Sequence, residues 1–316
     1  MFRVDAEFVG DGYVFLAVAR GDGTPPGLWL LDTGASVCVV DRRAARQVAM
    51  ARTGAQIEMS SAGRRSSPLS RLSAVDVVGT LCPTCDRSAV RALNVDAIVQ
   101  PLDGLWATIG GAHRRRYVGI LGYTWLRRHV VRIDYRRRSV WLQRAAQAAS
   151  PSLQQVTPLR TRVNAQGMVL VDAALDRLPP IGNACSGAGA TASWWIADTG
   201  ADSTLVSANA VRAWRLADAA LGDRSVTFTL ADRDEIPLVR RRFAVLRLAR
   251  AAGAADLLVP RPPSVLLDVE GGIGALQCAA VGTLGNEVFQ RLGVVWLDYR
   301  APSRVIWVER RQSDDA

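Results

Sequence analysis

The chain contains two similar eight-residue segments, each with Asp-Thr-Gly-Ala at the same place after an apolar run. Residues 29–36 read Trp-Leu-Leu-Asp-Thr-Gly-Ala-Ser, and residues 195–202 read Trp-Ile-Ala-Asp-Thr-Gly-Ala-Asp. A Leu-Gly pair at residues 121–122 recurs at 284–285, and an Asp-Tyr pair at 134–135 recurs at 298–299. Because several features recur in the same order at nearly one offset, the sequence predicts an internal duplication.

The length of the chain fits two related units. The 316 residues are enough for two domains of about 150 residues each. Residues 147–159 are mostly small and polar and include two prolines, which is typical of a linker. We therefore predict an N-terminal lobe over residues 1–146, a linker over 147–159, a C-terminal lobe over 160–310 and a tail over 311–316.

The local pattern favours strands. Short apolar runs bounded by Gly, Pro, Asp and Ser predict strands over residues 14–18, 28–31, 37–40, 139–142, 168–175, 225–230, 243–248 and 305–308. Helices are expected to be few and short, over residues 42–51, 123–128, 208–220 and 286–292. The predicted fold class is all-β, with two related lobes, a cleft between them and a few short helices.

Asp32 and Asp198 are the candidate catalytic residues, because each follows an apolar strand in a matched context. Two carboxyl groups roughly 3 Å apart cannot both ionise, so they share a proton. Such a pair can take a proton from water and give one to a carbonyl oxygen. The following residues of each loop are predicted to support the pair through short side chains and tight turns: Thr33, Gly34, Ala35, Thr199, Gly200 and Ala201.

The two Asp-Thr-Gly-Ala loops resemble the active-site loops of pepsin-like and retroviral-type (retropepsin-like) aspartic proteases. The later segments Ile120-Leu121-Gly122 and Thr283-Leu284-Gly285 resemble the segment that lies behind each loop in that family. The resemblance spans nearly the whole chain. It implies the acid-protease type of two-lobed fold, a grip formed by the two threonines, and an aspartic-type endopeptidase, a hydrolase that acts on a peptide or protein substrate in proteolysis.

One departure from the family pattern concerns the flap that would cover a substrate. Hairpins around residues 60–65 and 232–235 are the candidates. Pepsin-like enzymes usually carry a flap tyrosine in the first lobe, and no tyrosine occurs between Tyr13 and Tyr117. The alternative function is a catalytically silent peptide-binding or regulatory protein with the same fold.

No metal or organic cofactor is implied, and a monomer is sufficient because one chain supplies both aspartates. The five cysteines include one Cys-x-x-Cys, Cys82 to Cys85, which could be a redox pair, half of a zinc site or a loop feature with a small disulfide. A zinc site would need two further close ligands, and the chain has only His113 and His129. The loop feature is therefore the preferred interpretation.

The net charge of +10 comes from 39 basic residues, all of them arginine. They are scattered along the chain, so no nucleic-acid partner is expected. There is no secretory signal and no apolar run of about 18 residues, so we expect no membrane segment and a cytoplasmic location. A periplasmic or secreted location is the alternative if the true N-terminus is missing.

Overall fold

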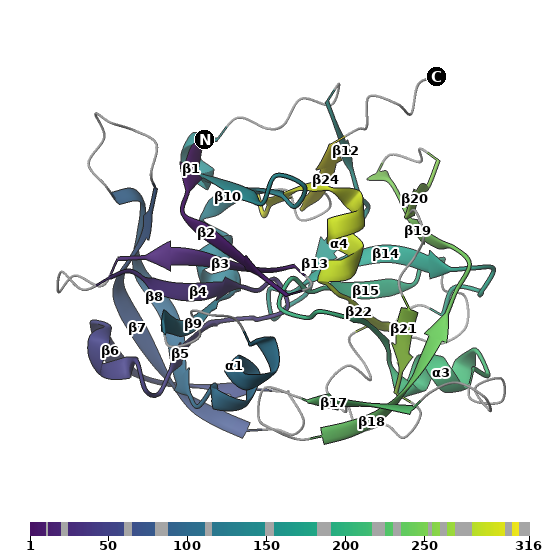
Figure 1. Ribbon diagram of the computed structural model, residues 1–316, viewed down its shortest axis with the longest axis horizontal. Coiled ribbons are helices and arrows are strands. Elements are labelled where there is room, and N and C mark those ends of the chain that lie inside the picture. The colour runs from purple at the N-terminus through teal and green to yellow at the C-terminus, as the bar shows by residue number, and fades with distance from the viewer. Residues whose placement is uncertain are drawn as a thin grey trace.

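The computed structural model describes most of the chain in fourteen segments. They are residues 1–10, 12–19, 25–59, 65–79, 88–110, 116–148, 155–181, 191–216, 225–229, 235–251, 255–259, 264–268, 280–300 and 305–309. Within them the protein consists mainly of strands in three sheets, with few short helices (Figure 1). The predicted all-β fold class is confirmed at this level.

The first sheet is built from the first half of the chain. Its described strands, in spatial order, are β2 (Ala6–Val9), β3 (Tyr13–Val18), β4 (Gly27–Leu31), β9 (Tyr117–Leu121), β5 (Cys38–Asp41), β8 (Ser88–Gln100), β7 (Arg65–Val78) and β6 (Met50–Met59). β3 also pairs with β7 at Val18 and Val77, so the sheet curves back on itself. It occupies the purple and blue side of Figure 1.

The second sheet is built from the second half. Its described strands are β17 (Ser225–Thr229), β18 (Glu235–Arg242), β21 (Ser264–Leu267), β16 (Thr204–Val206), β22 (Gly282–Leu284), β15 (Trp194–Ala197), β14 (Val169–Leu175), β19 (Leu246–Leu248) and β20 (Leu257–Val259), with β13 (Thr161–Val163) beside β14. It occupies the teal and green side of Figure 1.

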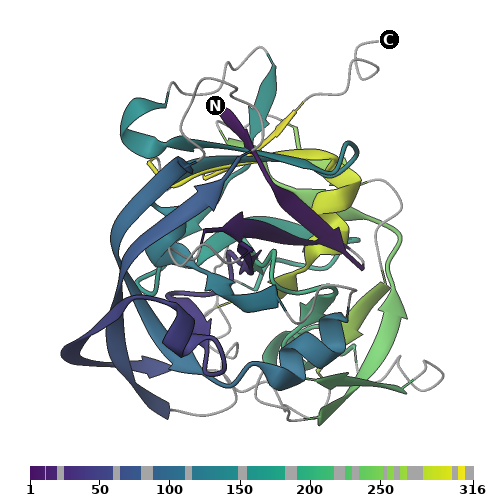
Figure 2. The same ribbon diagram turned by 60° about the vertical axis from the view of Figure 1, so that its left-hand side comes forward.

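The third sheet joins the two halves. Its described strands, in spatial order, are β1 (Phe2–Val4), β11 (Ser139–Arg144), β10 (His129–Asp134), β23 (Val294–Asp298), β24 (Ile306–Glu309) and β12 (Val156–Pro158). The two halves meet where β10 pairs with β23, from Val130 opposite Asp298 to Asp134 opposite Val294. Figure 2 shows this sheet lying across the top of the other two.

The same four-strand pattern occurs in both large sheets and positions the two repeated loops. β9 lies parallel to β4 and antiparallel to β5, and β5 lies parallel to β8. In the second half β22 lies parallel to β15 and antiparallel to β16, and β16 lies parallel to β21. The Asp32 loop therefore connects β4 to β5, and the Asp198 loop connects β15 to β16.

The helices are short, and three predictions about them need correction. The described helices are α1 (Asp103–Ile109), α2 (Tyr123–Leu126), α3 (Ala208–Ala213) and α4 (Asn286–Leu292). α4 has the predicted bounds, and α2 and α3 are shorter than predicted. Residues 42–51 form a single 3-10 turn, Ala45–Gln47, and then enter β6. Pairing with β7 from Met50 onward overrides the local helical propensity there.

The predicted domain boundaries remain a prediction, since residues 149–154 of the linker and the tail from residue 310 lie outside the described segments. In the described part of the chain, no helix is long and apolar enough to cross a membrane.

Candidate functional site

Asp32 and Asp198 lie at the ends of equivalent strands, where the two large sheets meet. The backbone N–H of Asp32 donates to the carbonyl of Leu121 at 3.1 Å, and that of Asp198 donates to the carbonyl of Leu284 at 3.0 Å. Parallel pairing of β4 with β9, and of β15 with β22, thus holds each aspartate at the end of its strand. The structure brings the two predicted residues together.

The two carboxyl groups are held by backbone N–H groups of their own loops. Oδ1 of Asp32 accepts from the N–H groups of Gly34 at 2.7 Å and Ala35 at 3.0 Å. Oδ1 of Asp198 accepts from the N–H of Gly200 at 2.8 Å. The two carboxyl groups also lie within hydrogen-bonding reach of each other. Each loop therefore fixes one oxygen and directs the carboxyl group toward the other half.

The glycines of the loops are required by the opposite carboxyl group. A Cβ at Gly34 would lie 2.5 Å from Cγ of Asp198, and a Cβ at Gly200 would collide with the carboxyl group of Asp32 in the same way. Neither glycine has a positive φ. Sequence reasoning assigned these glycines to the turn and to contacts with the carboxylates, whereas the structure shows that each makes room for the carboxyl group of the other half.

The two threonines connect the loops through four hydrogen bonds. The N–H of Thr33 donates to Oγ1 of Thr199 at 3.1 Å, and the N–H of Thr199 donates to Oγ1 of Thr33 at 3.0 Å. The Thr33 hydroxyl donates to the carbonyl of Ala197 at 2.6 Å, and the Thr199 hydroxyl to that of Leu31 at 2.8 Å. All four bonds cross between the halves, so the distance between the carboxyl groups is fixed by buried groups.

Two residues that sequence reasoning missed support the Asp198 loop. The Nδ2 group of Asn286 donates to the carbonyl of Thr199, and the hydroxyl of Tyr135 donates to Oδ1 of Asn286 at 2.9 Å. Tyr123 stands at the equivalent of Asn286 in the first half, where its N–H makes the equivalent backbone bond to Ala35. The repeat therefore gave no signal for Asn286, because the duplicated positions carry different residue types.

Burial and mutual repulsion favour the protonated form of the pair. Burial raises the pKa of Asp32 well above its usual range, and the negative charge of Asp198 raises it further. Burial also raises the pKa of Asp198, against hydrogen bonds from Asp32 and Gly200 that lower it. Both residues keep partial exposure, so solvent reaches them. The pair titrates as one unit and retains a proton above the usual range of a carboxyl group.

Tyr13, also missed, lies close to the pair. Burial raises the pKa of its hydroxyl, and the negative charges of Asp202 and Asp198 raise it further. Its hydroxyl therefore stays protonated beside the site and is available as a hydrogen-bond donor. Tyr13 begins β3 and lies outside both repeated motifs, so only the fold places it here.

Removing one of the two charges should stabilise the protein at high pH. A raised carboxyl pKa in the folded state gives stability that is present below the unfolded pKa of about 3.8 and is lost as pH rises. Asp198→Asn should therefore unfold with a free energy roughly 1–3 kcal/mol higher than the parent at pH 8, with no gain at pH 3. Urea unfolding at both pH values measures this.

The matched control for that prediction is Asp96→Asn, which removes a surface carboxylate paired with Arg71. Its effect should stay within about 0.5 kcal/mol. Equal stability of Asp198→Asn and the parent at pH 8 would show that the pair carries no electrostatic strain.

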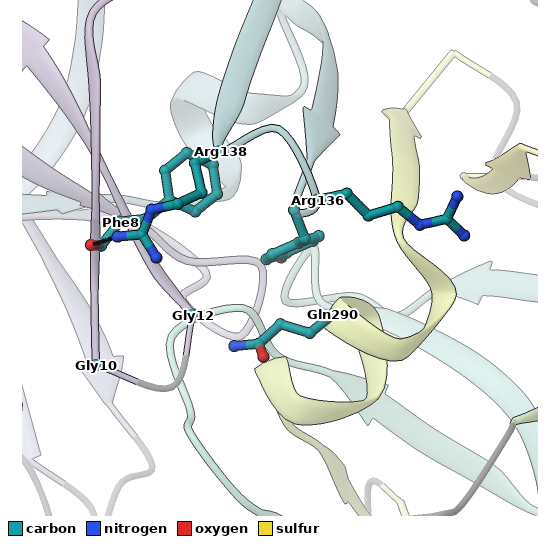
Figure 3. Close-up of a pocket in the computed structure, with 7 residues that line it drawn as sticks. Phe8, Gly10, Gly12, Arg136, Arg138 and Gln290 are labelled. Carbon is teal, nitrogen blue, oxygen red and sulfur yellow. Dashed lines mark hydrogen bonds between the residues drawn. The ribbon is translucent and has the colours of Figure 1, made fainter.

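A pocket of about 180 Å³ lies near the N-terminal hairpin, and neither aspartate lines it (Figure 3). Arg136, Arg138 and Gln290 are among the residues that line it. The two guanidinium groups point in different directions, and that of Arg138 lies over the ring of Phe8 and donates to its carbonyl. Since the charges do not converge, this pocket is not an anion site.

Other sequence predictions fall outside the described residues. Cys82 and Cys85, His113 and most of both flap candidates lie there. His129 is buried, with Nδ1 against the carbonyl of Trp125 at 3.0 Å, and burial lowers its pKa to about 4. In the described segments, no group of three or more His, Cys, Asp or Glu side chains could hold a metal ion.

Comparison with known proteins identifies the fold and no family. No family model matches the chain, and no curated protein matches its sequence. Among the solved structures with a similar fold is basic 7S globulin from soybean, with 12% identity, a TM-score of 0.52, and coverage of 97% of this chain and 94% of that chain. Another is conglutin gamma, a unique basic 7S globulin from lupine seeds, with 11% identity, a TM-score of 0.54 and the same coverage.

These comparisons contradict the assignment made from the motifs. Both similar structures are described as basic 7S globulins, and neither is described as a protease. The assignment to the aspartic protease family, the aspartic endopeptidase activity on a peptide or protein substrate, and the peptide-binding or regulatory alternative as stated are therefore not retained. The physical reason is that a fold and a local motif fix the geometry of the carboxyl groups but not the process that uses it.

Proposed function

We propose that the protein is a ligand-binding protein whose ligand contacts the Asp32–Asp198 pair. The observation that carries the proposal is the reciprocal geometry of the pair: each carboxyl group is held by its own loop and directed at the other, and both remain partly exposed. Asp32 and Asp198 are the ligand-contacting residues, and Thr33, Gly34, Ala35, Thr199, Gly200 and Ala201 support them.

The protonation state of the Asp32–Asp198 pair determines which functional group of a ligand it can bind. With one proton shared, one carboxyl group donates a hydrogen bond and the other accepts one. A ligand hydroxyl both donates and accepts, so it can satisfy both groups at once. An ether oxygen can only accept, and an ammonium group, which can only donate, is matched best by two ionised carboxyl groups. The pair therefore favours a neutral ligand that bears a hydroxyl group.

The architecture supports a monomeric binding protein. Two related lobes, residues 1–146 and 160–310, would enclose the ligand in a cleft between them, and one chain supplies both carboxyl groups. The likeness to proteins described as basic globulins agrees with the net charge of +10 of this chain. As part of the proposal, we place the protein in the periplasm or outside the cell, because that likeness favours this location over the cytoplasm.

Three probes on one scaffold test the proposal: cyclohexanol, methoxycyclohexane and cyclohexylamine, added to protein carrying ¹³C-labelled aspartate carboxyl groups. Cyclohexanol should shift the signals of Asp32 and Asp198 saturably at pH 7. Methoxycyclohexane should bind about tenfold more weakly, because one carboxyl group is left without a partner. Cyclohexylamine should bind only with release of the shared proton.

Variants of the two aspartates test whether cyclohexanol binds at the pair. Asp32→Ala and Asp198→Ala should weaken cyclohexanol binding about tenfold by removing one of the two hydrogen-bonding carboxyl groups, whereas Asp96→Ala, at the surface, should bind as the parent does. Equal binding of the alcohol and the ether would contradict the proposal. Chemical conversion of a bound compound, in place of reversible binding, would also contradict it.

A further inference from the structure

The Asp198 loop ends at a hydrogen bond to a carboxyl group. Thr204 is the first residue of β16, and its backbone N–H donates to Oε1 of Glu287 at 2.8 Å. Glu287 is the second residue of α4, and the N–H of Gly285 just before that helix donates to Oγ1 of Thr204 at 3.3 Å. The loop and the start of α4 are therefore locked to each other at Thr204.

The first half makes the equivalent bond with a different chemical group. Cys38 is the first residue of β5, and its N–H donates to Oγ1 of Thr124 at 3.2 Å. Thr124 is the second residue of α2, as Glu287 is of α4. The same backbone N–H is thus held by a neutral hydroxyl in the first half and by an ionisable carboxyl group in the second.

The surroundings of Glu287 set its charge near neutral pH. Burial raises its pKa to about 7, the N–H and hydroxyl of Thr204 and the charge of Arg291 lower it, and the charge of Asp202 raises it. Of the described strands packed on α4, β16 and β20 carry no titratable side chain. β23 carries Asp298, which pairs with Arg300 at 2.6 Å. Asp202 and Arg291 are therefore the charges that face it among the described residues.

We propose that Glu287 is a positioning residue that makes the hold on the Asp198 loop depend on pH. When Glu287 is ionised, its carboxylate accepts a charge-assisted hydrogen bond from Thr204, which is about twice as strong as a neutral one. When Glu287 is protonated, the bond weakens and the loop is held less firmly. This regulation rests on the proposed function, because the ligand would respond to the position of Asp198.

Ionisation of Glu287 has the opposite effect on the overall stability of the protein. Its pKa in the folded state, about 7, lies above the ordinary value of 4.5, so the stability that it contributes is present below pH 4.5 and is lost as pH rises through 7. Ionisation therefore strengthens one local bond while it lowers overall stability. A local readout is needed to separate the two effects.

Hydrogen exchange of the Thr204 amide, measured by NMR without ligand, tests the proposal. After correction for the intrinsic pH dependence of exchange, protection in the parent should be about tenfold lower at pH 6 than at pH 8. Glu287→Gln cannot titrate and should show no step. Asp202→Asn should move the midpoint of the step to lower pH. The Cys38 amide, held by Thr124, is the internal control and should show no step in any variant.

Glu287→Thr copies the hydroxyl of the first half and serves as a second variant in case the glutamine variant does not fold. A step that persists in either variant, or a parent without a step, overturns the proposal. In a separate arm, cyclohexanol should bind the parent more weakly at pH 6 than at pH 8 and bind Glu287→Gln equally at both. If cyclohexanol does not bind at all, the proposed function fails, while the amide exchange still decides whether Glu287 controls the loop.

Discussion

Thr199→Val is expected to lower the free energy of unfolding by roughly 2–5 kcal/mol. Valine keeps the shape of threonine but lacks the hydroxyl, so the buried N–H of Thr33 loses its acceptor and the carbonyl of Leu31 loses its donor. An unsatisfied buried polar group costs about 1–3 kcal/mol, and two are created here. Because the lost bonds join the two halves, urea unfolding should show the full effect.

A double-mutant cycle with Thr33→Val strengthens this test. Each threonine hydroxyl accepts from the N–H of the other, so the two substitutions should be non-additive by about 1 kcal/mol or more. Thr108→Val is the matched control, since it removes an exposed hydroxyl that donates to the carbonyl of Gly104. It should cost no more than about 0.5 kcal/mol. A cost for Thr199→Val as small as this would show that the bonds between the halves contribute little.

Gly34→Ala is expected to destabilise the fold by roughly 2–4 kcal/mol and to disturb the opposite aspartate. The added methyl group would lie 2.5 Å from Cγ of Asp198, so the carboxyl group or the loop must move. The displaced Asp198 carboxyl should then titrate separately from Asp32, because the shared proton requires close approach. ¹³C signals of the two carboxyl groups, followed across pH, measure this.

Gly200→Ala should displace the carboxyl group of Asp32 in the same way and make it titrate separately from Asp198. Gly54→Ala is the control: nothing lies within 4 Å of its Cβ, but its φ of +77° makes alanine strained. That variant should cost about 1–2 kcal/mol and leave the titration of the pair unchanged. An unchanged titration in Gly34→Ala would mean that the glycines do not set the approach of the carboxyl groups.

The repeated Asp-Thr-Gly motif predicts the geometry of the site but not its function. Asp32-Thr33-Gly34 and its repeat predicted a paired carboxyl site, and the structure places the pair as expected. The same motif also predicted proteolysis, which the comparisons do not support. The step from a pair that holds a proton to the process that uses it depends on the ligand that enters, and the motif does not specify the ligand.

Local sequence determined the parts of this protein that depend on short-range chemistry. Apolar runs before Asp32 and Asp198 form β4 and β15, because both strands are buried almost throughout and a strand buried on both faces requires a continuous apolar run. α4 has the predicted bounds, because Gly285 and Gly293 end the helical segment on both sides. The repeat itself predicted that two equivalent loops would exist.

Only the tertiary structure decided what surrounds those loops. Residues 42–51 do not form the predicted helix, because β6 pairs with β7 from Met50 onward. The hydrogen bonds of that pairing come from residues distant in sequence, so local helical propensity could not predict them. Asn286 and Glu287 differ from their counterparts in the first half, Tyr123 and Thr124, so the repeat did not mark them. Tyr135 belongs to the repeated Asp-Tyr pair, but the repeat did not reveal its contact with Asn286. Their roles follow from groups that meet across more than 80 positions of sequence. The bond between Tyr135 and Asn286 forms only once the two halves have packed together, and the other two form once the strands and helix of the second half have assembled.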